Sequence, residues 1–131
     1  MRTQAFLFAI PALLSLAPAA FAEPFGPIRV AANRGQYTGR CPVEVVFTGN
    51  INFVMPHTNG FVFNYHWERS DGAKGPVHVV RPAPHERMLV LHEKWRLGAR
   101  GQSHDISETL VVNSGNTHLS EASRPVHIEC K

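Results

Sequence analysis

The chain has 131 residues, a formal net charge of +3 at neutral pH and only 18% charged residues. Its basic residues are interspersed with acids and form no stripe interleaved with aromatic side chains, which argues against a nucleic-acid partner. No segment keeps a 3.6-residue apolar period, which argues against a helical domain.

The first 22 residues are typical of a secretory signal peptide. Arg2 follows the initiator Met, a mostly apolar run covers residues 5–17, and an A-x-A motif ends at Ala22. A buried N-terminal helix is the alternative, but Pro11 and Pro18 would interrupt it. We therefore expect cleavage after residue 22 and export of the mature chain.

Residues 23–131 then form one mature domain of 109 residues, with 12 basic and 10 acidic side chains. No other apolar run approaches the roughly 20 residues that a membrane helix needs, and no Cys follows the cleavage region. We expect no membrane anchor in the mature chain. Its pattern does not distinguish a periplasmic protein from a fully secreted one.

Two cysteines, Cys41 and Cys130, lie in the exported part. In an oxidising compartment such a pair favours a disulfide, which here would close nearly the whole domain. The loop-entropy model assigns such a bond about 4–5 kcal/mol as an upper estimate. A redox or metal pair would favour a C-x-x-C spacing, which the sequence lacks.

Short apolar segments separated by Gly, Pro, Asn and Ser predict seven β-strands. They cover residues 28–32, 41–53, 61–69, 77–81, 87–97, 107–113 and 123–130. Residues 98–105 and 114–121 are predicted as loops. This strand count predicts an all-β, immunoglobulin-like antiparallel sandwich. Its second and last strands run in opposite directions, so Cys41 and Cys130 can meet at one end of it.

Several motifs recur in an order that resembles a group of small exported bacterial immunoglobulin-like domains. The pieces are Y-x-G-x-C-P-V-x-V-x-F-x-G-x-I at residues 37–51, a tyrosine–tryptophan strand ending in W-E-R-S-D-G at 65–72, G-P-V at 75–77, W-x-L-G at 95–98, and a last strand closing on Cys130. The resemblance covers nearly all of the mature domain. It implies the fold, while no established activity comes with it.

The run "FVFNYHWERSDG" (residues 61–72) predicts a core strand and its turn. Phe61, Phe63, Tyr65 and Trp67 alternate with mostly polar residues, so we expect one aromatic face against the core. Asp71-Gly72 is expected to supply the positive backbone angles of a tight turn. On the opposite face, Glu68 is expected to meet a cation from an adjacent strand.

Eight histidines raise the question of a metal site, because zinc and copper both bind imidazole. Alternation predicts that His66, His78, His92 and His127 point outward, with His78 opposite an inward Val77 and Val79. If the fourth and fifth predicted strands are partners, His78 and His92 share an exposed sheet face and are the candidate metal ligands. His66 and His127 would then lie on the other sheet. Scattered surface histidines and a pH-responsive surface are the alternatives.

Catalysis finds little support in the sequence. There is no G-x-S-x-G motif. Ser103, His104 and Asp105 are consecutive, and adjacent residues of an extended chain point apart, so they are not expected to form a triad. We therefore expect a protein that is not an enzyme and needs no cofactor.

Polar loops at the ends of the sandwich are the expected binding elements. The candidate residues in them are His57, Asn59, His85, Arg100 and His104. The sequence thus predicts a non-enzymatic binding module that contacts a protein or a glycan through end loops or an edge strand. An inhibitor of a secreted hydrolase (a protease or lysozyme) and a periplasmic metal-binding protein using surface histidines are the alternatives.

Overall fold

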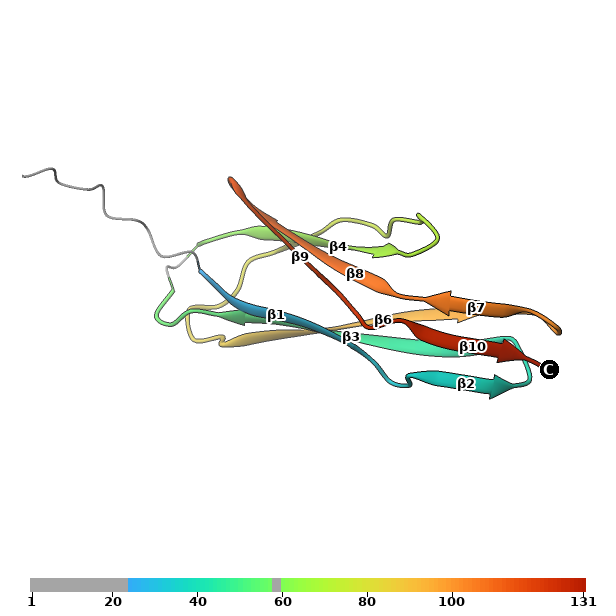
Figure 1. Ribbon diagram of the computed structural model, residues 1–131. Helices are drawn as coiled ribbons and strands as arrows, with labels where there is room; N and C mark the ends of the chain where they lie inside the picture. The colour runs from blue at the N-terminus through green and yellow to red at the C-terminus, as the bar shows by residue number, and fades with distance from the viewer. Residues whose placement is uncertain (1–23, 58–59) are drawn as a thin grey trace, which may run out of the picture.

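A computed structural model describes residues 24–57 and 60–131, and these form an all-β domain (Figure 1). The predicted signal peptide and Asn59 lie outside the described residues. The strands are β1 (Phe25–Ala32), β2 (Gln36–Gly39), β3 (Val43–Phe53), β4 (Phe63–Arg69), β5 (His78–Val80), β6 (Met88–Leu97), β7 (Ser103–Ile106), β8 (Glu108–Ser114), β9 (Thr117–Ala122) and β10 (Val126–Cys130). No helix in this part of the chain is long and apolar enough to cross a membrane.

The strands pack as two layers (Figure 1). One layer is the sheet β1-β3-β6, and the other combines the sheets β5-β4-β8-β9 and β2-β10-β7. The latter two are continuous along the chain, since β7 leads into β8 and β9 into β10. β1 and β2 are likewise two halves of one strand. The first half, β1, pairs with β3, and the second half, β2, pairs in parallel with β10 in the other layer. Counted in this way, the ten segments make seven strands, and the predicted immunoglobulin-like sandwich is confirmed.

All seven predicted strands are present, but two of the predicted loops contain strands. Residues 98–105 include the start of β7, and residues 114–121 include most of β9. Their sequences are polar because these strands have solvent-facing positions, so they lack the apolar alternation that marks a core strand. β2 was missed for the same reason, because it is a short strand with little burial.

Period-two alternation positions the core. In β3 every second residue from Val43 to Phe53 is buried, and the residues between them are partly buried or exposed. Gly49 occupies one of these inward positions, where an added Cβ would lie 2.8 Å from Leu110 Cδ2 and 2.9 Å from Trp67 Cη2. The absence of a side chain at Gly49 therefore allows the two layers to approach.

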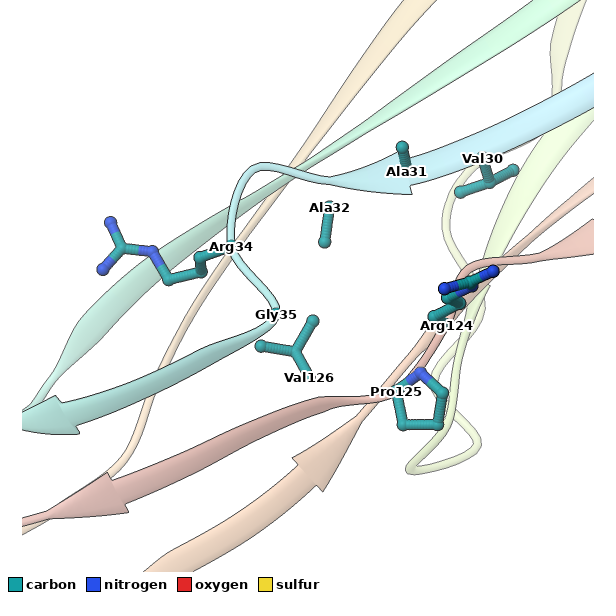
Figure 2. A pocket seen from close by; sticks show the side chains of 8 residues that line it. All are labelled: Val30, Ala31, Ala32, Arg34, Gly35, Arg124, Pro125 and Val126. Carbon is teal, nitrogen blue, oxygen red and sulfur yellow. The ribbon is translucent and has the colours of Figure 1, made fainter.

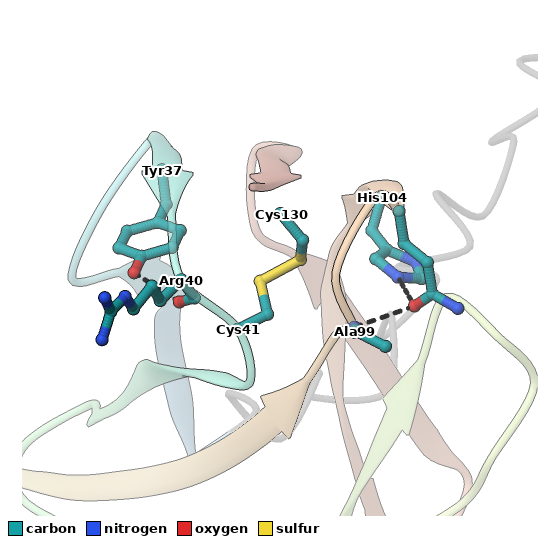
Figure 3. The surroundings of a disulfide bond; sticks show 7 residues. Tyr37, Arg40, Cys41, Ala99, His104 and Cys130 are labelled. Carbon is teal, nitrogen blue, oxygen red and sulfur yellow. Dashed lines mark hydrogen bonds between the residues drawn. A yellow bond between two sulfur atoms is a disulfide. The ribbon is translucent and has the colours of Figure 1, made fainter.

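The disulfide joins Cys41 and Cys130 across 89 residues, as predicted, with a Cα–Cα distance of 5.4 Å (Figure 3). It attaches the end of β10 to the start of β3. Gly98 faces the bond with a φ of +99°, and a Cβ there would lie 2.7 Å from Cys130 Sγ. A glycine is required at this position both by the backbone conformation and by the space that the sulfurs occupy.

The turn after β4 forms where Asp71-Gly72 predicts it. The Gly72 N–H donates to the Arg69 carbonyl at 2.9 Å, and the Ala73 N–H donates to Asp71 Oδ1 at 2.9 Å. Gly72 has a φ of +94°, whereas no non-glycine residue in the described part of the chain has a positive φ. The prediction is therefore wrong for Asp71, which serves the turn through its side-chain acceptor.

Candidate functional site

Most of the exposed apolar side chains lie on or beside two edge strands, β5 and β6. These are the outermost strands of their sheets, and we call the surface along them the β5–β6 side. Among the described residues, the large exposed hydrophobics come from β5 and the residue before it, from β6, and from the loop between β3 and β4. They are Val54, Val62, Val77, Val79, Met88 and Val90. Exposed apolar side chains beside a free sheet edge are typical of an interaction surface.

Val79 of the edge strand β5, and Val77 just before this strand, face solvent. Val77 is 61% exposed and Val79 is 75% exposed, so the prediction that they face the core is wrong. His78 instead stacks on Tyr65 at a ring-centroid distance of 5.0 Å, and Val80 packs against the core. The register explains this, because His78 lies opposite the inward Tyr65 and Val79 lies opposite the outward Asn64.

The predicted partnership of the fourth and fifth strands is also wrong. β5 pairs with β4, and β6 pairs with β3, because residues 81–87 cross from one layer to the other. His78 and His92 therefore lie in different sheets. His66 was expected in the opposite sheet from His78, but β4 and β5 are paired, so the two share one.

The remaining outward histidines have local partners. The side chain of His66 is only 15% exposed, and its Nε2 lies 2.9 Å from Glu68 Oε1. The same oxygen of Glu68 also lies 3.6 Å from Lys74 Nζ. Glu68 thus has a cation as its partner, but Lys74 belongs to the segment between β4 and β5 and not, as was predicted, to an adjacent strand. His127 bonds Asp105 at 2.8 Å and Glu129 at 3.1 Å, and these hydrogen bonds raise its pKa.

His92 lies on the outer face, as alternation predicts, with Nδ1 3.2 Å from Thr48 Oγ1. No group of three or more His, Cys, Asp or Glu residues in the described ranges could hold a metal ion. The residues that the structure describes thus do not bring the candidate ligands His78 and His92 into one cluster.

The predicted loop residues divide between the two ends of the sandwich. His57 lies in the loop after β3, and exposed His85 lies in the connection 81–87. These two segments meet, since the Phe53 N–H donates to the Arg87 carbonyl at 2.8 Å. His57 is packed rather than free. Its Nε2 lies 2.8 Å from the Glu86 carbonyl, and its ring contacts Phe53 edge-on.

His104 lies at the disulfide end (Figure 3), and Arg100 belongs to the turn that leads into its strand. Arg100 is exposed in the turn before β7, where the Gly101 N–H donates to the Cys130 carbonyl at 2.9 Å. His104 belongs to β7 and lies 3.0 Å from Gln102 Oε1. Its neighbour Asp105 bonds His127 instead, so the consecutive Ser-His-Asp residues form no triad, as alternation predicts.

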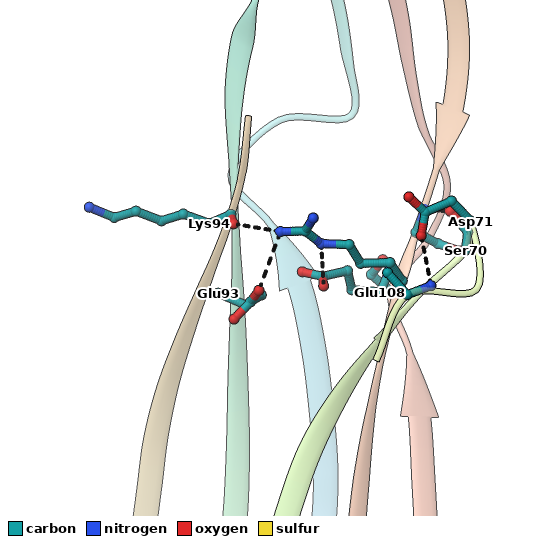
Figure 4. Close-up of polar contacts among 9 residues, drawn as sticks. Ser70, Asp71, Glu93, Lys94 and Glu108 are labelled. Atoms are coloured by element: carbon teal, nitrogen blue, oxygen red, sulfur yellow. Dashed lines mark hydrogen bonds and ion pairs between the residues drawn. The ribbon is translucent and has the colours of Figure 1, made fainter. Parts of the chain in front are cut away.

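An ionic cluster lies inside the sandwich, behind the β5–β6 side. Arg69 Nη2 is 3.6 Å from Glu93 Oε1, and Arg69 Nε is 3.7 Å from Glu108 Oε1 (Figure 4). The guanidinium also donates to the Lys94 carbonyl at 3.3 Å and lies 4.9 Å from the ring centroid of Trp95. One cation therefore serves two carboxylates from opposite layers.

Glu108 has the most perturbed environment in the cluster. It is 0% exposed, and neither carboxylate oxygen has a hydrogen-bond partner among the described residues. Burial, and to a smaller extent the charge of Glu93, raise its pKa from an ordinary value of 4.5 to about 7, against the opposing effect of Arg69. A strongly perturbed acid beside a pocket is a feature shared by many functional sites.

A pocket of about 270 Å³ lies beside this cluster, and we call it the lateral pocket. It is lined by Trp67, Arg69, the segment 73–76, Glu93 and Glu108. The segment 73–76 leads directly into β5, while Glu93 belongs to β6. The lateral pocket therefore lies between the segment that precedes β5 and the edge strand β6.

Sequence reasoning did not find the cluster, although alternation carried the signal. Arg69 continues the inward positions of Phe63, Tyr65 and Trp67. Glu93 lies between the inward Leu91 and Trp95, and Glu108 precedes Leu110 at the same spacing. Three charged residues at inward positions of three strands mark a buried ionic cluster, but only the strand pairing shows that they meet.

A second pocket, of about 270 Å³, lies on the other side of the sandwich, where β1 gives way to β2. Figure 2 shows Arg34 and Arg124 on opposite sides of it, with the small side chains of Ala31 and Ala32 between them. Arg34 lies over the Tyr37 ring at 5.2 Å. The two guanidinium groups therefore do not converge on one position.

No family model and no curated protein matches the sequence. Among solved structures, the chain is similar to the CARDB domain of a protein from Pyrococcus furiosus, which was solved in complex with di-metal ions. The TM-score is 0.54 at 12% sequence identity, over 83% of this chain and 98% of that chain. At this identity the similarity shows the fold, and it agrees with the immunoglobulin-like arrangement of the strands.

Proposed function

We propose that this chain is an exported, non-enzymatic binding module that contacts another protein along the β5–β6 side. The observation that carries the proposal is the coincidence of two free sheet edges with the exposed apolar side chains. An edge strand offers unpaired backbone N–H and C=O groups to an added strand, and alternate side chains then provide specificity.

β5 is the better receptor of the two edges. It carries the most exposed valine and has no charged residue within it. Natural proteins protect an edge strand from pairing with charges such as lysine. β6 is protected in this way, since its outward positions include Lys94 and Arg96. The unprotected β5 favours an extended segment of a protein as the partner.

We include in the same proposal that the chain is exported and that it belongs to the group of small bacterial immunoglobulin-like domains that its sequence resembles. A disulfide that closes most of the domain is typical of proteins in oxidising compartments. The signal-peptide pattern of the first 22 residues supports the same location.

Retention of partners on the immobilised, disulfide-intact protein tests the proposal. Extracts of the envelope and culture medium of its own cell are passed over the wild type, Val79→Lys and Ser120→Lys. Val79 and Ser120 both lie on strands at an edge of the same sheet, β5 and β9, and both side chains are exposed. We expect a protein that the wild type and Ser120→Lys retain and Val79→Lys loses. Equal retention by all three, retention of a glycan alone, or no retention would each contradict the proposal.

A further inference from the structure

The lateral pocket has more acidic than basic groups in its interior. Glu93 and Glu108 contribute two carboxylates, and Arg69 contributes one guanidinium. Lys74 also lines the pocket, but its ammonium group pairs with Glu68 on the outer face of β4. The stem of Lys74 therefore covers the pocket while its charge is directed elsewhere.

The contacts of Glu108 show that it shares one cation with Glu93. Within residues 24–57 and 60–131, the one ion pair of Glu108 is with Arg69 at 3.7 Å, and the same guanidinium also lies 3.6 Å from Glu93. Both carboxylate oxygens of this fully buried residue have no hydrogen-bond partner among the described residues. Buried polar groups are nearly always hydrogen-bonded in folded proteins, so the pocket is incomplete as it stands.

Glu93 is the carboxylate that an incoming group can reach. Its side chain is 29% exposed, whereas that of Glu108 is fully covered. It lies close enough to Tyr65 to raise the pKa of that phenol, after the larger effect of burial. A cation that pairs with Glu93 would free Arg69 to pair with Glu108.

The pocket also lies where a segment added to β5 would pass. Its outer wall is the segment 73–76, which continues into Val77 and β5, and its other wall is Glu93 on the edge strand β6. A strand paired with β5 directs alternate side chains toward the inner face, as His78 and Val80 do. One such side chain would therefore point toward the opening between the two layers.

We propose that the segment bound by β5 carries a lysine or arginine whose cationic end enters the lateral pocket and pairs with Glu93. This inference rests on the proposed function and adds the chemistry of the partner. The ligand supplies the cation that the Arg69, Glu93 and Glu108 cluster lacks, and the aliphatic part of its side chain lies beside Trp67.

A library of random nonapeptides displayed on phage tests the inference. It is selected on the wild type, Glu93→Gln, Glu108→Gln and the control Glu44→Gln. The selection is run at pH 8, above the raised pKa of Glu108. Either pocket substitution then lowers the negative charge of the cluster by about one, so each should abolish selection for a basic residue. Glu44 is exposed on β3 outside the pocket, and its substitution changes the charge of the protein equally. We expect the wild type and the Glu44→Gln variant to select the same lysine or arginine position.

The best peptide is then synthesised with its basic residue and with norleucine in its place. Amide chemical shifts of the isotope-labelled wild type show whether each peptide contacts residues 77–80. We expect the basic peptide to bind about tenfold more tightly, the effect of one charge-assisted hydrogen bond. Equal affinity of the two peptides at β5 would overturn this inference and leave the proposed function standing. If no selected peptide perturbs β5, both are overturned.

Discussion

Replacing Glu108 by glutamine should remove a large pH dependence of stability. The raised pKa, about 7 against an ordinary value of 4.5, means that folding disfavours the ionised carboxyl group. Each unit of difference corresponds to about 1.4 kcal/mol, so the cost of ionisation in the folded protein is about 3 kcal/mol. This stability is fully present below pH 4.5 and is lost as the pH rises to 7.

Glutamine has nearly the shape of the protonated acid and cannot ionise. We therefore expect Glu108→Gln to match the wild type near pH 5 and to exceed its free energy of unfolding by about 3 kcal/mol at pH 8. Urea unfolding, monitored by tryptophan fluorescence at pH 5, 6, 7 and 8, measures the free energy of unfolding of the wild type and of the variant. His127, whose pKa is also raised, contributes a pH dependence of the same sign, but it is present in both proteins and cancels in the difference.

The control is Glu44→Gln, since Glu44 is exposed on β3. We expect it to retain the pH dependence of the wild type and to change stability by less than about 0.5 kcal/mol. If Glu108→Gln kept the same slope between pH 5 and 8 as the wild type, the reasoning about the buried cluster would be refuted.

Three further changes test the same architecture by denaturant unfolding. Arg69→Ala leaves two carboxylates without their cation, so we expect the free energy of unfolding to fall by about 3–5 kcal/mol at pH 8 and by less at pH 5. Equal losses at the two pH values would contradict the ionic role of Arg69. Gly49→Ala forces a methyl group against Leu110, and we expect a loss of about 1–3 kcal/mol, whereas an unchanged midpoint would show that the layers can separate. Removing the disulfide by Cys41→Ala with Cys130→Ala should cost about 4 kcal/mol, given the 89-residue separation, and no change on its removal would argue against a closed loop.

Alternation along the chain was a reliable guide wherever a strand has one buried face. The aromatic run of β4 lies toward the core as predicted, with Phe63 and Trp67 buried and Phe61 and Tyr65 packed against them. It failed at β5, where Val77 and Val79 were expected inside. A three-residue edge strand has too few positions to bury either face, so apolar character alone does not show which face is inward.

The candidate site depended on information that a linear pattern does not contain. His78 and His92 appeared to be neighbours because their strands follow one another, yet the connection 81–87 places them in different layers. Conversely, Arg69, Glu93 and Glu108 are far apart in the sequence and meet through the ion pairs of one guanidinium.

The sequence by itself determined the immunoglobulin-like class of the fold, the strand alternation that forms its core, and the pairing of Cys41 with Cys130. These follow from local periodicity, turn residues and the presence of only two cysteines. Only the tertiary structure decided which strands are edges, which side exposes its valines, and that Glu108 is buried with a single shared cation. The physical reason is that edges, burial and charge pairing arise from contacts between strands, and such contacts depend on how the chain crosses between the two layers.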